Sequence, residues 1–169
     1  MDAIAVLVEQ LSRVPAALRA AVDGLSPEQL TAAPSPGANT IGWLGWHIAR
    51  GQDAQVAEVA GTEQVYLSGD WPRRFGLEAD ASDTGYGHDR GDVRAVRPES
   101  ADALLEYLDA VHRATLDYLA TLTEADLDRV VDASWDPPVT LGVRLVSTLA
   151  DCLQHVGQAA YVKGLNGRD

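Results

Sequence analysis

The sequence predicts an all-α protein: a four-helix bundle in which a long connection crosses over between the second and third helices. Three observations support this fold class. Four stretches repeat apolar residues with the 3.6-residue period of an amphipathic helix. Capping residues or glycines mark most of their ends. An aperiodic segment, residues 62–99, separates the second helix from the third, and such a crossover lets these two helices run in the same direction.

The first two helices are expected at residues 2–23 and 40–61. The first ends near Gly24, and its apolar stripe consists of Ile4, Leu7, Val8, Leu11, Val14, Leu18 and Val22. The second helix begins at Thr40, a residue type that commonly caps a helix N-terminus, and continues through IGWLGWHIARGQDAQVAEVA. Its residues Trp43 and Trp46 are expected to lie in the core.

The third and fourth helices follow the aperiodic segment. Ser100 is a natural N-cap for the third helix, whose apolar spine consists of Leu104, Leu108, Val111, Thr115 and Leu119. The fourth helix is expected from Leu141 to Val162, ending at Gly164.

A short pattern occurs twice along the chain. The segments LSPEQL (25–30) and LTEADL (122–127) each predict one capped helical turn. Each is followed by a proline-containing loop and then by a helix that opens with TIG (40–42) or TLG (140–142). Either the bundle is built from two related helix pairs, or common capping signals coincide.

The crossover, residues 62–99, is rich in glycine and proline and has no sustained period. A connection of this length is uncommon in a compact domain and is usually either functional or disordered. Because it contains Trp71, Phe75 and Tyr86, we expect it to pack across the bundle.

Length and composition fit one domain spanning residues 1–169, since 46% of the residues are hydrophobic. The formal net charge of −12 disfavours nucleic acids and anionic membranes as partners. No apolar run approaches the roughly 20 residues of a membrane span. With one cysteine, Cys152, the chain forms no internal disulfide. We therefore expect a cytoplasmic protein that is a monomer or a homodimer.

One histidine on the second helix and an aspartate–histidine pair on the fourth form the candidate site. Asp151 and His155 are four residues apart, so they share one helix face. His47 follows Thr40 by seven residues, whereas the pair follows Thr140 by eleven and fifteen. The offsets of seven, eleven and fifteen residues differ by four, about one helical turn. If the two helix pairs are related, the three side chains therefore lie on equivalent faces of their helices and could converge inside the bundle.

Two imidazoles and one carboxylate suit zinc, nickel or iron(II), and three protein ligands leave coordination positions open. The alternative is structural: Asp151 and His155 hydrogen-bond each other, or Asp151 faces solvent and His155 is a satisfied core histidine. Cys152 is a rival third ligand, although a cysteine is more often a small buried hydrophobe. His112 is expected in the core or at its boundary, and His88 in a solvated loop.

Two further residues are expected to support the ligands. Gln158 lies three residues beyond His155, and Arg144 shares a helix face with Asp151. Both are therefore candidate hydrogen-bond partners of the ligands, and the alternative for Arg144 is that it caps the end of the bundle.

Four stretches carry a family resemblance: TIGWLGWHIARG in the second helix, WPRRFG and DTGYGH in the crossover, and LADCLQHVGQAAYVKGL in the fourth helix. With them, the chain resembles the DinB-like metalloprotein superfamily over essentially its whole length. Within it, the chain is similar to the actinobacterial branch that includes mycothiol-dependent maleylpyruvate isomerase. Members commonly have three histidines at the positions of His47, Asp151 and His155, which implies a metal site. Asp151 departs from that pattern, although the isomerase also has a carboxylate there, a glutamate.

The resemblance implies a metal-dependent thiol S-transferase or isomerase. A divalent metal, zinc first and nickel or iron as alternatives, would deprotonate a low-molecular-weight thiol such as mycothiol, and the thiolate would attack a small electrophile. Arg73, Arg74 and His88 are candidate substrate contacts, because an arginine pair can clamp a carboxylate. The alternatives are a metal-dependent hydrolase and a non-catalytic metal- or ligand-binding bundle, whose site is degraded because aspartate is shorter than glutamate.

Overall fold

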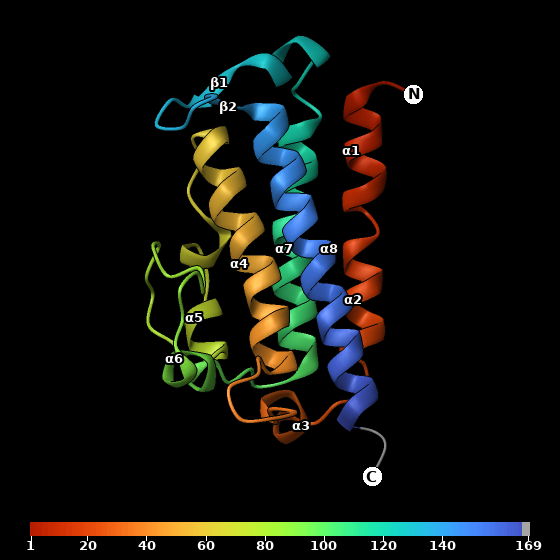
Figure 1. Cartoon of the computed structure of the whole chain (residues 1–169), viewed down its shortest axis with the longest axis vertical. Coiled ribbons are helices and arrows are strands. Elements are labelled where there is room, and N and C mark those ends of the chain that lie inside the picture. The colour runs from red at the N-terminus through yellow and green to blue at the C-terminus, as the bar shows by residue number, and fades with distance from the viewer. Residues whose placement is uncertain (167–169) are drawn as a thin grey trace.

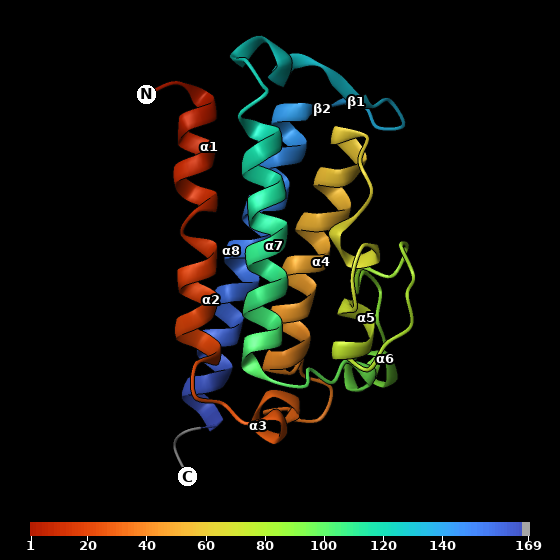
Figure 2. The same cartoon turned by 180° about the vertical axis from the view of Figure 1, so that it is seen from behind.

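Four helical columns form the body of the computed structural model, which describes residues 1–166 (Figure 1). The columns consist of α1 (Ala3–Leu11) followed end to end by α2 (Val14–Val22), then α4 (Ile41–Ala60), α7 (Ala101–Leu119) and α8 (Leu141–Asn166). Helices α4 and α7 run in the same direction, opposite to α1, α2 and α8 (Figures 1 and 2). The predicted all-α, four-helix bundle is confirmed.

The first column is broken, although the sequence predicts one continuous helix over residues 2–23. Helix α1 ends at Leu11 and α2 begins at Val14, with Pro15 in the first turn of α2. Proline has no backbone N–H, so Pro15 cannot donate the helical hydrogen bond to the carbonyl of Leu11. The apolar stripe still faces inward on both halves, which explains why the periodicity alone did not reveal the break.

The ends of α4 and α7 follow the predicted capping residues. The Thr40 hydroxyl accepts a hydrogen bond from the backbone N–H of Trp43, and the Ser100 hydroxyl accepts one from Ala103. Gly61 ends α4 in the left-handed conformation, with φ of +68°, which glycine adopts without a steric penalty. These caps fix where α4 begins and therefore fix the register of every side chain that it carries.

Helix α8 extends further than predicted, through Gly164 to Asn166. The Lys163 ammonium donates hydrogen bonds to the backbone carbonyls of Ala20 and Asp23 at the end of α2, at 2.9 and 3.1 Å. This tertiary contact holds the last turn of α8 against α2, which outweighs the helix-ending tendency of glycine.

Short elements connect the columns. They are α3 (Pro27–Thr31), the 3₁₀ turns η1 (Val65–Leu67) and η2 (Glu124–Asp128), α5 (Trp71–Arg74), α6 (Arg90–Ala95) and the antiparallel strands β1 (Val130–Asp132) and β2 (Val139–Thr140). The hairpin of β1 and β2 was not predicted, because its strands are too short to show an alternating pattern. Elements η1, α5 and α6 lie in the long connection between α4 and α7 and pack beside α4 (Figure 1).

The two short turns support the hypothesis of related helix pairs. A Cβ atom added to Gly42 would lie 3.0 Å from the backbone oxygen of Leu30, the last residue of LSPEQL. A Cβ atom added to Gly142 would lie 3.3 Å from the backbone oxygen of Leu127, the last residue of LTEADL. In both pairs, therefore, the first turn of the long helix packs directly against the short turn that precedes it.

A buried ion pair on α4 ties the long connection to the bundle. Arg50 is fully buried, and its guanidinium contacts the carboxylate of Asp53, which is 4% exposed. The same guanidinium donates to the backbone oxygens of Ala81 and Asp83, at 3.2 and 3.0 Å, and stacks on the ring of Tyr66. Arg50 therefore holds a segment that lies more than 30 residues further along the chain.

Asp53, the acidic member of the pair, binds a second part of the long connection and also α7. Its carboxylate accepts hydrogen bonds from the backbone N–H groups of Val65 and Tyr66 and from the hydroxyl of Tyr107 on α7. Both charges thus have several partners, which a buried ion pair needs to offset its desolvation cost.

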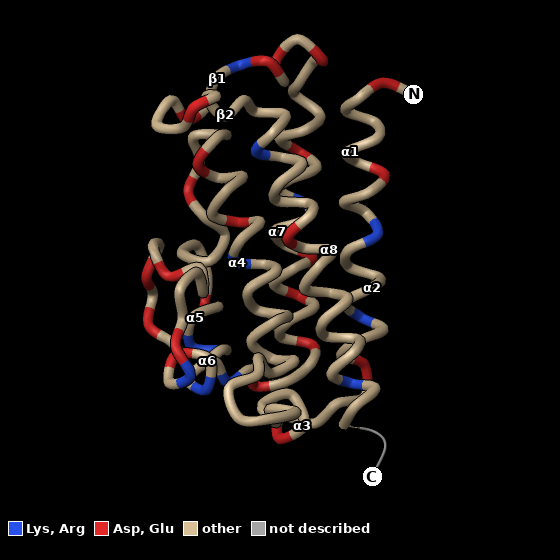
Figure 3. Tube along the Cα trace, in the orientation of Figure 1, with Lys and Arg blue, Asp and Glu red and all other residues tan. Residues whose placement is uncertain are grey.

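Charged residues are unevenly distributed over the fold. Acidic positions occur on all sides, whereas a group of basic positions gathers around α5 and α6 (Figure 3). Among residues 1–166, no helix combines the length and the apolarity needed to cross a lipid bilayer.

We expect Asp53→Ala to lower the free energy of unfolding by about 3–5 kcal/mol, because it leaves the Arg50 charge buried without its partner. Urea denaturation followed by circular dichroism measures this change. Glu9→Ala, which breaks the exposed Arg13–Glu9 pair, is the matched control and should change stability little. Equal losses in the two variants would contradict a structural role for the buried pair.

Candidate metal centre

The structure brings His47, Asp151 and His155 together between α4 and α8. One ligand atom from each of the three lies within 4.8 Å of the others. The Nε2 atom of His47 is 3.6 Å from one carboxylate oxygen of Asp151, and the Nε2 atom of His155 is 3.3 Å from the other. Around a tetrahedral ion with bonds of about 2.0–2.1 Å, ligand atoms are separated by roughly 3.4 Å. The three residues could therefore hold a metal ion.

The Nδ1 atoms of both histidines have hydrogen-bond partners, as the second ring nitrogen of a metal-binding imidazole usually does. The Nδ1 atom of His47 lies 2.5 Å from the backbone oxygen of Thr84, which can only accept, so Nδ1 carries the proton. The Nδ1 atom of His155 lies 2.9 Å from Oε1 of Gln158, as expected from the sequence. Both Nε2 atoms thus face Asp151, where a metal ion would replace any proton that they carry, and second partners of this kind orient metal ligands.

Aromatic rings cover the buried side of the centre. The indole of Trp43 stacks on the imidazole of His47 with ring centroids 4.6 Å apart, and its edge meets His155. The Trp43 indole N–H donates to Nδ1 of His88 at 3.1 Å, and Nε2 of His88 donates to Asp83 at 2.8 Å. His88 also stacks on Trp46. The prediction of a solvated His88 is therefore wrong: its ring supports the Trp43 layer.

The electrostatic environment favours a neutral His47 beside an ionised Asp151. Burial lowers the pKa of His47, against the opposing effects of the Thr84 carbonyl and the Asp151 carboxylate. Although burial alone would raise it, the hydrogen bond and charge of His155 and the charge of His47 hold the pKa of Asp151 below its usual value. The Asp151 hydrogen bond raises the pKa of His155. The chemistry of this donor set, nitrogen, nitrogen and carboxylate oxygen, fits zinc, nickel or iron(II).

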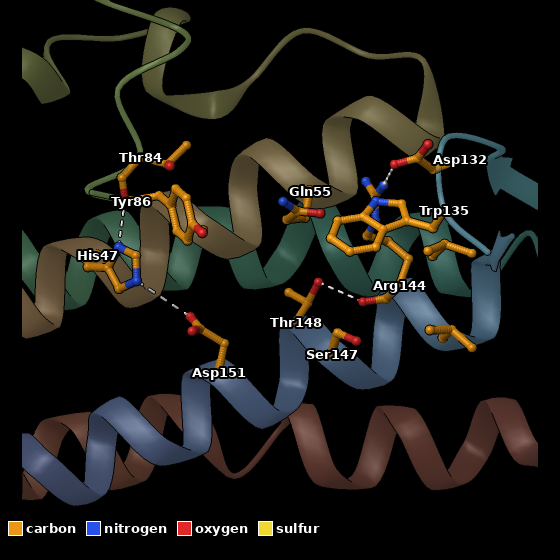
Figure 4. Close-up of a pocket in the computed structure, with 13 residues that line it drawn as sticks. His47, Gln55, Thr84, Tyr86, Asp132, Trp135, Arg144, Ser147, Thr148 and Asp151 are labelled. Carbon is orange, nitrogen blue, oxygen red and sulfur yellow. Dashed lines mark hydrogen bonds and ion pairs between the residues drawn. The ribbon is translucent and has the colours of Figure 1, made fainter. Parts of the chain in front are cut away.

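A cavity of about 480 Å³ opens from the centre along the groove between α4 and α8 (Figure 4). His47 and Asp151 lie at one end, and Tyr86 of the long connection stands at the mouth with its side chain almost fully exposed. Polar uncharged groups line the middle: Gln55, Ser147 and Thr148. A small molecule in this cavity would therefore reach the carboxylate of Asp151 directly.

The far end of the cavity is built by the β1–β2 hairpin. Trp135 lines it with 66% of its surface exposed. Arg144 forms an ion pair with Glu58 at 2.6 Å and lies 3.8 Å from Asp132 of the hairpin (Figure 4). Arg144 thus connects the hairpin to α4, which agrees with the structural alternative for this residue and not with a role as a partner of the ligands.

Arg73 and Arg74, predicted to contact substrate, lie elsewhere. The guanidinium of Arg73 is paired with Asp70, and that of Arg74 with Glu99 and Glu106. Neither arginine lines the cavity beside the metal centre. Their charges are satisfied within the long connection and by α7, so this placement does not support substrate binding there.

The rival ligand Cys152 points away from the centre. It is 1% exposed, and its sulfur lies 3.9 Å from the backbone oxygen of Ile48 and from Oε1 of Gln52. Burial raises the pKa of the Cys152 thiol to about 12, so the thiol stays protonated at neutral pH. His112 on α7 is partly buried, at the boundary of the core as expected, and lies outside the ligand cluster.

Several residues of the site carry no local sequence signal. The Thr84 carbonyl, Tyr86 and Trp135 come from loops that become neighbours of α4 only through tertiary packing. A detectable signal was the glycine pair in DTGYGH: Gly85 has φ of +88°, and a Cβ atom there would lie 2.8 Å from Nδ1 of His47. Only glycine fits so close to the imidazole.

Comparisons with known proteins agree with this architecture. A family model described as DinB superfamily matches residues 10–159. A solved structure, the crystal structure of a conserved protein of Enterococcus faecalis, is similar with a TM-score of 0.89 and 30% sequence identity. The match covers 98% of this chain and 97% of that chain. No match was found among curated proteins.

Replacing any one of the three ligands should remove most of the bound metal while leaving the helical fold intact. We expect His47→Ala, Asp151→Ala and His155→Ala to retain far less zinc than the unmodified protein after loading and desalting, measured by elemental mass spectrometry. His112→Gln is the control, since it removes a histidine outside the cluster. Equal zinc content in His155→Ala would rule out the triad.

Gly85→Ala should weaken zinc binding by roughly 10–100-fold, the usual effect of losing a group that orients a ligand. The added methyl would displace the Thr84 carbonyl from His47, and competition with a zinc chelator measures the affinity. Gly87→Ala is the matched control, because Gly87 has a similar φ of +78° but no neighbouring atom within 4 Å of an added Cβ. The same loss of affinity in Gly87→Ala would mean that backbone strain, not the His47 contact, is responsible.

Proposed function

Because the chain belongs to the DinB superfamily, we propose that it is a metal-dependent enzyme that joins a low-molecular-weight thiol to a small electrophile, or isomerises the electrophile through that thiol. The observation that carries the proposal is the position of the triad. His47 and Asp151 line one end of a cavity of about 480 Å³, and His155 completes the triad beside them. Three protein ligands would leave a coordination position open toward that cavity.

Zinc is the first candidate metal, with nickel and iron(II) as alternatives. A divalent cation held by the triad would supply Lewis acidity, which lowers the pKa of a thiol well below its usual value near 8.5. The protein's own contribution is to orient both imidazoles through Thr84 and Gln158. The Trp43 ring excludes water from the buried side.

Thiol chemistry is better supported here than hydrolysis. In a metal-dependent hydrolase, a carboxylate or histidine beside the metal usually accepts the proton of the attacking water. Among the described residues that line the cavity, the acidic side chains are Asp151 and Asp132, and Asp132 lies at the far end beside Arg144. A thiol needs no such base, because its proton leaves to solvent on coordination.

Mycothiol is the first thiol to test, since the motifs in α4, the long connection and α8 resemble those of mycothiol-dependent maleylpyruvate isomerase. In the reaction, the thiol proton is released and the sulfur forms a bond to an electrophilic carbon. At the same time, either the bond from that carbon to a leaving group breaks, or the π bond of an activated double bond breaks and its electron pair moves to the conjugated carbonyl. Isomerisation would follow if that bond breaks again after rotation about the former double bond.

Zinc-loaded protein should accelerate conjugation of mycothiol to a fluorogenic bimane electrophile, and the rate should fall to the uncatalysed level in Asp151→Ala. Glutathione and free cysteine, assayed in parallel, show whether the thiol is selected. Stoichiometric zinc without acceleration for any of the three thiols would instead support the non-catalytic metal-binding alternative.

A further inference from the structure

A second cavity, of about 630 Å³, lies between the loop of residues 33–40 and helix α6. We call it the basic cavity, because Arg90 and Arg94 line one wall of it. Ser35 and Asn39 line the other wall and add a hydroxyl and an amide. None of these four residues belongs to the metal centre or to the cavity that opens from it.

The two arginines have no carboxylate partner among residues 1–166. By contrast, both arginines in neighbouring α5 are ion-paired, as are Arg13, Arg19, Arg50 and Arg144. Arg90 and Arg94 are four residues apart on α6, so their like charges face one another on the same side of the helix. Arg97, just beyond α6, also forms no ion pair within this part of the chain, which adds to the positive potential there.

One carboxylate beside the arginines, that of Asp89, already has hydrogen-bond partners. Asp89 lines the basic cavity, but its Oδ1 atom accepts hydrogen bonds from the backbone N–H groups of Gly91 and Asp92. In return, the Asp92 carboxylate accepts a hydrogen bond from the Asp89 N–H. This reciprocal cap stabilises the first turn of α6, and it leaves the two guanidinium groups free for another anion.

The position of Arg90 is set by the opposite loop. Gly37 has φ of +87°, and a Cβ atom added there would lie 2.9 Å from Nε of Arg90. The guanidinium therefore lies flat against the loop backbone and closes one side of the cavity. Such placement reduces the side-chain freedom that Arg90 would lose on binding a ligand.

We propose that the basic cavity binds a small polyvalent oxyanion, either a phosphate group or a dicarboxylate. Two guanidinium groups present planar pairs of donors that match both kinds of oxyanion. A bound oxyanion would also offset the repulsion between Arg90 and Arg94. This local excess of positive charge contrasts with the chain as a whole, which has 25 acidic and 13 basic residues.

The basic cavity is connected to the metal centre through one side chain. His88 lines the basic cavity, accepts a hydrogen bond from Trp43, and Trp43 stacks on His47. An oxyanion at Arg90 and Arg94 would therefore bind directly beside the aromatic layer that supports the metal ligands. The proposal itself rests on the cavity and its arginines and is independent of the proposed function.

Isothermal titration of the full chain with inorganic phosphate, and separately with malonate, tests the proposal at constant ionic strength. We expect one site per chain for at least one of the two anions, and at least tenfold weaker binding in the double variant Arg90→Gln/Arg94→Gln, because each charge-assisted hydrogen bond contributes strongly. The two anions distinguish a phosphate site from a carboxylate site.

Two controls separate this site from other causes. The double variant Arg13→Gln/Arg19→Gln removes the same charge at the start of α2 and within it, and should bind as the unmodified protein does. His155→Ala tests whether the anion binds a metal instead. No binding of either anion, equal weakening in both arginine double variants, or loss in His155→Ala with retention in Arg90→Gln/Arg94→Gln would each overturn the proposal.

Discussion

The buried pair of Arg50 and Asp53 is the interaction on which the rest of the structure depends. Asp53 binds the start of the long connection, through the N–H groups of Val65 and Tyr66. Arg50 binds its middle, through the carbonyls of Ala81 and Asp83. The next carbonyl along the chain, that of Thr84, is the one that orients His47. A charge pair one turn beyond His47 on α4 thus determines how the connection lies over that imidazole.

Local sequence signals predicted the parts of the fold that depend on local physics. Thr40 and Ser100 mark helix starts because a hydroxyl can satisfy backbone N–H groups that the helix leaves free. Prediction failed where a single residue or a distant contact determines the end of a helix. Pro15 breaks the first column, and Lys163 extends α8 by donating hydrogen bonds to the end of α2. The β1–β2 hairpin is held by tertiary contacts, including the Arg144 pair with Asp132.

The same distinction applies to the candidate site. The spacing of Asp151 and His155 and the repeated helix pair made the three side chains candidates, and the family resemblance favoured them over a structural role. The structure brings these three side chains together. Of their supporting groups, Gln158 was predicted, whereas Thr84 was missed because a backbone carbonyl has no residue-type signature. His88 was misplaced for a related reason: it lies between glycines and charged residues in sequence, yet Trp43 and Trp46 cover it in the folded chain.

Aspartate at position 151 is compatible with metal binding because of where α4 lies. His47 and His155 approach different oxygens of one carboxylate, so the short side chain already spans the distance between the two imidazoles. Gly51, one turn beyond His47, faces Asp151: a Cβ atom there would lie 3.6 Å from Oδ2. Without that side chain, the carboxylate remains accessible from the cavity, and the side chain of Asp151 is 46% exposed. A longer glutamate would bring its oxygens further toward α4 and the cavity. Aspartate therefore leaves more open space beside the ligands for a small molecule in the cavity.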